Sequence, residues 1–565
     1  MKTGHRPDNW KAPLRSADKV MRLAQMGAFH QSRLSFMRVL LRRLKAESWR
    51  FEVKLFEIDD NCVGQAVYSA IGPTHTYSLV AFAHDLPDEL RSDRVIAHAW
   101  DATFTLFDGV PTKADIERLS KNVPVQEAGR VSAKELSVSR ANRSVRLWAH
   151  VVDALAEGRQ PDAQKVLDVG YLMRTTAVYG NGKLGAADRT SYIDRPMVAN
   201  PFSVEMLSVF LTRAFVMDLV EHAARAKGGD KAIKLEPYLR RQFGIGNSTG
   251  LGMAPFLTYH PALLNNWIAA REEALSRVRS VKTASAGEQE CFKSFLYRAI
   301  QNANDWHSKH DLQIEKINIL RADLSALSDH VASQDLSADY AWDALMAWAE
   351  DALGLEGQEQ LVSLLLEPYG DLVDGLANTM KADEAATFCI DGTKTVAETL
   401  KCIHENYDWA FGVDYSSPEN SARFWYVSEE KLEPRLGERY KEDGCELETP
   451  HCIARDMDAF RKTLETWPSD TLLADVLMKH PEHRQVARRA QLTQKLPYAE
   501  MRDNQLADIM LPIDMLRSKL SFFGATKFDP RSDRWLRICM YQNAPFPNDL
   551  ADGPSDDWAY PSLNQ

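Results

Sequence analysis

The stretch FEVKLFEIDDNCVGQAVYSAIGPTHTYSLVAFAH, residues 51–84, has the pattern of paired strands along its whole length. Apolar and polar residues alternate, and β-branched and aromatic side chains are frequent, as in strands that bury one face. Turn signals at Asp59-Asp60-Asn61 and Gly72-Pro73 divide it, and DATFTLFDG (101–109) repeats the pattern after a third turn. We therefore predict a small antiparallel sheet of about four strands within residues 51–130.

Downstream of this sheet, from about Ser132, the apolar spacing becomes that of helices. Residues 201–225 are apolar on nearly every face and precede Gly228-Gly229, which predicts a buried helix with a glycine terminator. Amphipathic helices are expected at 261–281, 288–330, 340–366, 395–405 and 484–520. The predicted fold class is α+β and predominantly α-helical, with a small N-terminal antiparallel sheet, a large helical body and an aromatic, non-helical C-terminal tail.

These patterns divide the chain into six segments. They are a basic amphipathic segment (1–50), a β-rich domain (51–130), a helical body (131–405), an aromatic and charged insertion (406–455), a helical segment (456–523) and a C-terminal tail (524–565). The tail is rich in Pro and Asp but contains aromatic residues, among them Trp535, Tyr541, Phe546, Trp558 and Tyr560. Such a tail is expected to wrap around the body or a neighbouring subunit.

The composition is that of an ordinary globular protein: the 565 residues are 45% hydrophobic and 26% charged, enough for more than one core. Seven cysteines form no CxxC pair, which favours a reducing compartment. The N-terminus lacks the pattern of a secretory signal, and no apolar window reaches the roughly 20 residues of a membrane span. We expect a cytoplasmic protein without a transmembrane segment.

Positive charge is concentrated at the N-terminus, where residues 1–50 hold twelve Lys and Arg against three Asp and Glu. Arg33, Arg38, Arg42, Arg43 and Lys45 predict the cationic face of an amphipathic helix. Such a helix could dock on acidic groups of its own chain or of a sister subunit, lie on an anionic lipid surface, or bind nucleic acid. The acidic pI, about 5.8, argues against nucleic acid as the main partner and favours docking.

The most distinctive loop is FGIGNSTGLGMAPF, residues 243–256, with four glycines around Asn247, Ser248 and Thr249. Glycines let the backbone approach a ligand, and the N-terminus of a following helix would attract a phosphate or carboxylate. The pattern is neither a Walker A motif nor a dinucleotide fingerprint, because no strand is expected before it. The competing interpretation is a tight turn between helices.

A second loop of similar character is RTTAVYGNGKLGAADRTSYIDR, residues 174–195. Its candidate anion-binding residues are Arg174, Asn181, Lys183 and Arg189, and Asp188 and Tyr179 are candidates for proton transfer. The alternative is a charged surface loop held by local ion pairs. A helical hairpin between the two loops would bring them together, and an anion would then be held from two sides.

Other charged groups are weaker candidates. Arg435, in Glu433-Pro434-Arg435, could stand at a pocket rim, although such charge runs are usually solvated. His307 and His310 share a helix face, but no motif supplies further metal ligands, and His480-Pro-Glu-His483 is weaker still, so no metal is predicted. Asp218 and His222 could be an orienting carboxylate and a base, or a satisfied buried pair, which we favour.

Two hypotheses on function follow. The first is a cytoplasmic enzyme that acts on a small anionic metabolite or uses a phosphate-bearing cofactor, whose identity the sequence does not give. The alternative is a non-catalytic assembly or regulatory protein whose glycine loops are packing turns and whose termini hold a homo-oligomer together. A flavin or nicotinamide enzyme is a third, weaker possibility, because no Rossmann pattern is present.

Overall fold

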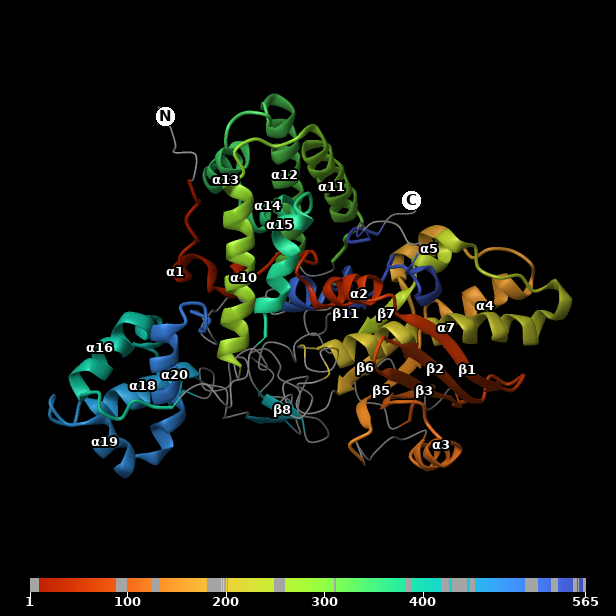
Figure 1. Cartoon of the computed structure of the whole chain (residues 1–565), viewed down its shortest axis with the longest axis horizontal. Helices are drawn as coiled ribbons and strands as arrows, with labels where there is room; N and C mark the ends of the chain where they lie inside the picture. The colour runs from red at the N-terminus through yellow and green to blue at the C-terminus, as the bar shows by residue number, and fades with distance from the viewer. Residues whose placement is uncertain are drawn as a thin grey trace. The chain divides into compact units, whose positions relative to one another are not determined.

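The computed structural model describes residues 10–87, 99–123, 132–179, 195, 197, 200, 202–247, 260–308, 311–381, 389–417, 426–428, 445–447, 453–502, 517–529, 537–551, 556 and 558–561. Contacts divide the chain into two compact units (Figure 1). The helical unit comprises Met1–Ala28, Leu251–Phe292 and Ala326–Ser518, and the sheet unit comprises Phe29–Gly250, Lys293–Ser325 and Lys519–Gln565.

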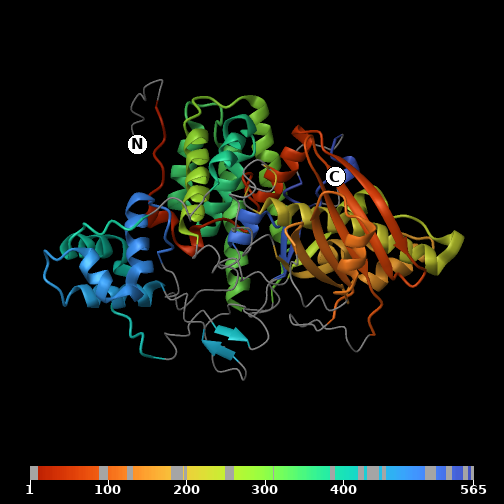
Figure 2. The same ribbon diagram turned by 60° about the horizontal axis from the view of Figure 1, so that its bottom comes forward.

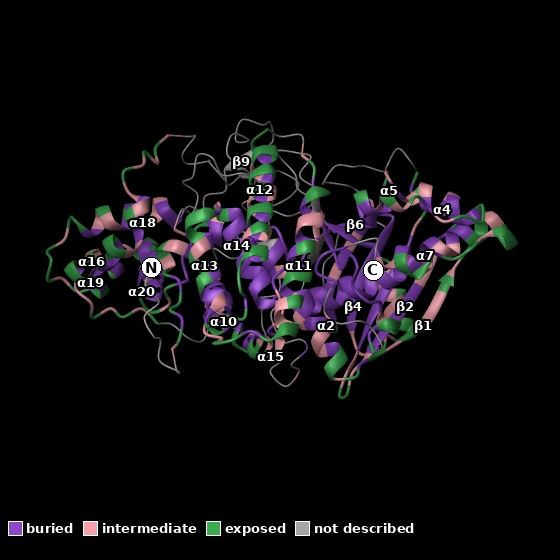
Figure 3. Cartoon of the chain, turned by 90° about the horizontal axis from the view of Figure 1, so that it is seen from above, coloured by how far each residue is buried: buried purple, intermediate pink, exposed green. Residues whose placement is uncertain are grey.

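The sheet unit is built on a curled sheet (Figure 2). It has nine strands in the order β1-β2-β3-β4-β5-β6-β7-β11-β10. Its strands are β1 (Arg50–Ile58), β2 (Gly64–Ile71), β3 (Thr76–Ala83), β4 (Ala102–Asp108), β5 (Glu135–Arg143), β6 (Tyr171–Tyr179), β7 (Gly244–Asn247), β10 (Lys527–Asp529) and β11 (Arg537–Met540). All neighbours are antiparallel except β6 and β7, which run parallel. The edge strand β1 is largely exposed (Figure 3), whereas β3 is buried along nearly its whole length.

The prediction of a small four-stranded sheet is therefore wrong in size. The four strands read from the sequence are β1 to β4, but β5, β6 and β7 lie in the segment predicted to be helical. β7 is only four residues long and contains two glycines, so its strand conformation depends on pairing with β6 and β11 rather than on local propensity. Two more strands, β10 and β11, come from the C-terminal region.

Helices cover both faces of the sheet. Val67, Val80 and Phe107 pack with partly buried side chains of α3 (Lys113–Ser120) on one face. On the other face, Tyr68 and Phe104 make edge contacts with Phe215 of α7 (Ser203–Gly228). Because consecutive strand residues point to opposite faces, Val67 and Tyr68 contribute to two different layers of the core.

The long helix α7 confirms the prediction of a buried helix ended by glycine. Most of its residues are buried, and Gly229 follows it with φ +57°, a conformation that favours glycine. Gly228 allows close contact with α4 (Trp148–Ala156), because a Cβ atom there would lie 2.2 Å from the Ala156 carbonyl oxygen. Helix α7 connects β6 to β7 and so forms the crossover that a parallel pair requires.

The basic N-terminal helix, α2 (Phe36–Ala46), docks on its own chain. The fully buried Arg38 donates to the Asp556 carboxylate at 3.2 Å, and Arg42 donates to the same carboxylate at 2.5 Å. The predicted docking on acidic groups is confirmed for these two arginines. The aromatic residues Tyr541, Phe546, Trp558 and Tyr560 are also buried, so this part of the tail belongs to the core of the sheet unit.

The helical unit has two packed groups of helices. In the first, α10 (Pro261–Arg279) contacts α13 (Ala341–Ala352), α14 (Leu355–Leu366) and α15 (Gly370–Val373). In the second, α16 (Val396–Tyr407), α18 (Ile453–Leu464), α19 (Leu473–Lys479) and α20 (Arg484–Lys495) share a core that includes Ile403, Met457 and Phe460. A predominantly helical chain, as predicted, is confirmed.

The remaining elements are short or divided between the units. They are α1 (Ala17–Val20), α5 (Ala163–Val169), α8 (Pro237–Arg241), α11 (Ala286–Asn304), α12 (Asp311–Ser333), and the pair β8 (Tyr426–Ser428) and β9 (Cys445–Leu447). Among the described residues, no helix combines the length and the apolar character that crossing a bilayer demands.

Candidate functional site

The two predicted loops start from neighbouring parallel strands. The loop at 174–195 begins within β6, which ends at Tyr179, and the loop at 243–256 begins one residue before β7, which ends at Asn247. In the register of this pair, Thr175 lies opposite Asn247 and Arg174 lies opposite Gly246. Because β6 and β7 are parallel, the carboxyl ends of both strands point toward the same end of the sheet.

Hydrogen bonds fix the two strands to each other at this point. The Asn247 amide donates to the Thr175 hydroxyl at 3.3 Å, and that hydroxyl donates to the Gly246 carbonyl oxygen at 3.3 Å. Asn247 and Thr175 are 5% and 1% exposed, so both side chains are held inside the sheet unit. Arg174 is also buried, but as the neighbour of Thr175 in a strand it points to the opposite face.

Two of the four glycines have a packing role. A Cβ atom on Gly244 would lie 2.3 Å from the Met540 carbonyl oxygen, and one on Gly246 would lie 2.8 Å from the Tyr171 ring. These glycines therefore allow β7 to fit between β11 and β6. The element before residue 243 is the helix α8, as expected, but β7 lies within the segment predicted to be a loop and ends at Asn247, the first residue of the polar triplet.

Most of the remaining predicted site residues lie outside the described part of the chain. This holds for Asn181, Lys183, Asp188, Arg189, Ser248, Thr249 and Arg435, and of Tyr179 only the strand backbone is described. Their roles stay predictions. Thr175, which the structure adds to the site, had no sequence signal beyond its place in the Thr175-Thr176 pair near the start of the first loop.

A buried arginine that sequence reasoning did not select holds β7 in place. Arg213 of α7 is 0% exposed and donates to the carbonyl oxygens of Phe243, Arg241 and Ala544 at 2.5, 3.0 and 2.9 Å. Its guanidinium carbon lies 3.8 Å from the centre of the Phe546 ring. Burial lowers the pKa of Arg213 to about 9, yet the group stays charged at neutral pH. The charged interruption in an otherwise apolar helix was the signal that marked it.

A second cluster of polar residues in the sheet unit, which includes Asp218 and His222, lies at a pocket of about 330 Å³ beside β1 and α7. Asp218 accepts from the Tyr68 hydroxyl at 2.5 Å, and the ring nitrogen Nε2 of His222 lies 2.8 Å from the Asp59 carbonyl oxygen. Burial and the nearby Asp218 carboxylate raise the pKa of Tyr68. Asp218 and His222 thus have separate partners, and we assign no reaction to them.

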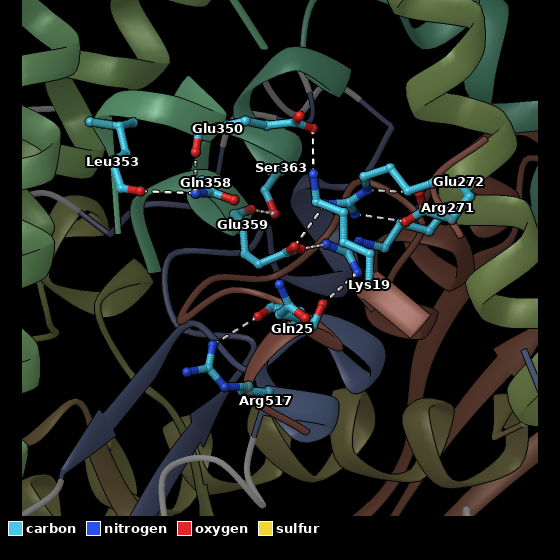
Figure 4. Close-up of polar contacts among 12 residues, drawn as sticks. Lys19, Gln25, Arg271, Glu272, Glu350, Leu353, Gln358, Glu359, Ser363 and Arg517 are labelled. Carbon is cyan, nitrogen blue, oxygen red and sulfur yellow. Dashed lines mark hydrogen bonds and ion pairs between the residues drawn. The ribbon is translucent and has the colours of Figure 1, made fainter. Parts of the chain in front are cut away.

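The helical unit contains a buried ionic cluster, defined here as Arg15, Arg271, Arg517, Glu272, Glu356 and Glu359. Figure 4 shows Arg271, Glu272 and Glu359 close together, and Arg271 pairs with Glu359. Arg15 donates to Glu272 and Glu359 at 2.7 and 2.8 Å, and Arg517 pairs with Glu356. Burial is the largest single effect on Arg15 and opposes its charge, but the ion pair and hydrogen bond with Glu272, together with the attraction of Glu350 and Tyr498, outweigh it and raise the pKa of Arg15.

This ionic cluster ties the N-terminal segment to the helices. Arg271 also donates to the Gln25 carbonyl oxygen at 3.3 Å, and Arg517 donates to the Gly27 carbonyl oxygen at 3.0 Å. Three positive and three negative groups balance, so the cluster has no excess charge to offer a ligand. We interpret it as a structural cluster that holds residues 10–28 against the helices.

Of the histidines weighed as metal ligands, His310 lies outside the described residues, so its pairing with His307 is not tested.

Comparison of the chain with protein-family models, with curated proteins and with solved structures gives no match. What the protein binds is therefore inferred from its own residues.

Proposed function

We propose that the protein is an enzyme that binds a small anionic metabolite, or a phosphate-bearing cofactor, beyond the carboxyl ends of β6 and β7. The parallel pairing of these strands, with Thr175 opposite Asn247, is the observation that supports this proposal. Where parallel strands of a sheet end, the loops that follow commonly form ligand sites. In the sequence, Gly180, Gly182 and Gly185 follow the end of β6, and Gly250 and Gly252 follow the end of β7.

In this proposal the positive charge comes from the first loop and the backbone donors come from the second. Lys183 and Arg189 would bind the anion, Asn181 would add an amide, and the N–H groups at Asn247, Ser248 and Thr249 would complete its surroundings. Asp188 and Tyr179 would be the groups for proton transfer. Arg174 points away from Thr175, so we give it a secondary role.

The proposed compartment is the cytoplasm. Cys62, Cys402 and Cys539 are buried free thiols, which fits a reducing environment. We do not extend the proposal to a homo-oligomer, because Tyr541, Phe546, Trp558 and Tyr560, the aromatic residues considered for a subunit contact, are buried.

The test is a thermal-shift screen of the full chain with phosphate-bearing and carboxylate metabolites. A ligand present at about 100 times its Kd stabilises the native state by about 2.7 kcal/mol, which shows as a raised unfolding midpoint. We expect Lys183→Ala to abolish this shift without changing the midpoint in the absence of ligand. Lys165→Ala, an exposed lysine on α5, is the matched control and should keep the shift.

Asn247→Ala separates binding from packing. Because its amide also holds Thr175, this variant is expected to lose about 1 kcal/mol without ligand as well as the ligand-induced shift. If Lys183→Ala is destabilised without ligand and no anion shifts the wild type, the loops are packing turns and the non-catalytic alternative replaces this proposal.

A further inference from the structure

The tight turn between α19 and α20 gathers three side chains that commonly bind metals. His480, Glu482 and His483 each offer a ligand atom, and these atoms all lie within 4.8 Å of one another. We propose that this turn binds one divalent transition-metal ion of the zinc class. This inference is independent of the proposed anion site.

The backbone explains why the two histidines meet. Pro481 begins a single 3-10 turn, Pro481–His483, and the His483 N–H donates to the His480 carbonyl oxygen at 3.2 Å. His480, the residue that caps this turn, and His483 at its end have ring centres 6.1 Å apart. The fixed φ of Pro481 makes this turn stiff, and the ligands are brought together before any ion binds.

His483 is held in the orientation and tautomer that a ligand needs. It is 8% exposed, its ring packs against Phe460, and Nε2 lies 2.9 Å from the Thr463 hydroxyl. That hydroxyl donates its proton to the Ala459 carbonyl oxygen at 3.1 Å, so it must accept a proton from His483 Nε2. The lone pair then remains on Nδ1, and such support of the second ring nitrogen is typical of metal-binding histidines.

His480 and Glu482 form the adjustable side of the site. His480 Nδ1 and a Glu482 carboxylate oxygen are 3.2 Å apart, and their side chains are 36% and 60% exposed. An ion about 2.1 Å from both atoms would see them at an angle of roughly 100°, which suits neighbouring ligands in tetrahedral or octahedral geometry. Because both side chains are partly free in solvent, small rotations can bring them to bonding distance.

The donor set selects the class of ion. Two imidazole nitrogens with one carboxylate suit zinc, cobalt, nickel or copper, whereas magnesium and calcium prefer oxygen ligands. Three protein ligands leave at least one position for water. The Trp467 ring is 6.2 Å from the His480 ring, and Lys479 Nζ lies 5.0 Å from the centre of the Trp467 ring, so this indole can report on binding.

The experiment is a titration of the metal-free full chain with Co²⁺, followed by visible absorption, with displacement by Zn²⁺. We expect His480→Ala and Glu482→Gln to weaken binding at this site by at least tenfold. Thr463→Val, which removes the hydroxyl that bonds to His483 Nε2 and to the Ala459 carbonyl oxygen, should weaken it by about 10–100-fold. His404→Ala, an exposed histidine on α16, is the matched control and should bind like the wild type.

A second readout locates the ion. Cu²⁺ bound at this site is expected to quench the fluorescence of Trp467. This quenching should be absent in Trp467→Phe, which lacks the indole, and in His480→Ala, which lacks a metal ligand. If His480→Ala fails to fold, as judged by circular dichroism without metal, Glu482→Gln decides, because its side chain is exposed. Equal Co²⁺ affinity and stoichiometry in the wild type, His480→Ala and Glu482→Gln would overturn the proposal.

Discussion

Arg213 is the side chain on which the position of β7 most depends. It is fully buried, and its partners are carbonyl oxygens of Phe243, Arg241, Ala544 and Pro545 rather than a carboxylate. Hydrogen bonds from a charged donor are stronger than neutral ones, and buried acceptors that lose them are costly. One side chain thus joins α7, the entry to β7 and the C-terminal segment.

We expect Arg213→Met to lower the free energy of unfolding by about 3–5 kcal/mol, because it leaves these buried carbonyl groups without their donor. Denaturant unfolding followed by circular dichroism measures the loss. Arg159→Met removes an arginine whose side chain is 55% exposed and should change stability by less than about 0.5 kcal/mol. A similar small effect for both variants would contradict the role given to Arg213.

His84 provides a pH dependence at the residue scale. It follows β3 and is partly buried, and desolvation lowers its pKa from 6.5 to about 4, although Asp101 acts in the opposite direction. The unfolded state therefore takes up a proton before the folded state does as the pH falls. Stability that is complete above pH 6.5 should decrease as the pH approaches 4.

The expected loss is on the order of 1–2 kcal/mol, reduced from the full shift because the ring is partly exposed. Unfolding free energies of the wild type and His84→Gln between these pH values measure it. The difference between the two proteins should narrow as the pH falls. A constant difference across this range would show that His84 does not titrate in this way.

At the scale of elements, β7 is the strand that most needs its glycines. Gly244→Ala would place a Cβ atom 2.3 Å from the Met540 backbone oxygen, which cannot move without disrupting β11. We expect a loss of about 2–3 kcal/mol or more, measured by denaturant unfolding. Gly287→Ala in α11 has nothing within 4 Å of its Cβ and should instead stabilise by about 0.5–1 kcal/mol. Equal effects would contradict the close packing of β7.

The local sequence pattern was enough to predict some elements but not others. Apolar and polar residues alternate in β1 and β4, turn signals bound β2 and β3, and α7 combines a long apolar stretch with a glycine terminator. In contrast, β5 is rich in polar residues and β7 is half glycine, so these strands form only because neighbours pair with them. Propensity along the chain does not contain that information.

The sequence likewise predicted only some features of the candidate site. Glycines and charges marked both loops, and a helical hairpin was expected to bring the loops together. In the structure, a β6-α7-β7 crossover instead places the strands β6 and β7 side by side. The Thr175–Asn247 contact joins residues 72 positions apart and follows from the register of a parallel pair. Register is set by the whole sheet, so single residues could not predict it.

At the scale of the whole molecule, buried charge fixes segments that lie far apart in the sequence. Arg38 and Arg42 bind Asp556 in the sheet unit, and Arg15 binds Glu272 and Glu359 in the helical unit. In each unit, an N-terminal segment is held by ionic contacts. The basic N-terminus therefore contributes to internal contacts of both units.

Arg15→Met tests this use of charge in the helical unit. It leaves the buried Glu272 and Glu359 without one of their partners, and removing one member of a buried ion pair costs about 3–5 kcal/mol. We expect residues 10–28 to detach, so that limited proteolysis cleaves there faster than in the wild type. Lys11→Met, which removes a 62% exposed partner of Glu273, should leave the cleavage rate unchanged.

The double variant Arg15→Met/Glu272→Leu separates charge from packing. Apolar replacement of both members of a buried pair is often nearly neutral, so the double variant should recover part of the stability that Arg15→Met loses. The coupling between the two substitutions is obtained from unfolding free energies of the four proteins in a double-mutant cycle. If the double variant is as unstable as the sum of the single variants, the N-terminal segment is held by shape rather than by its charges.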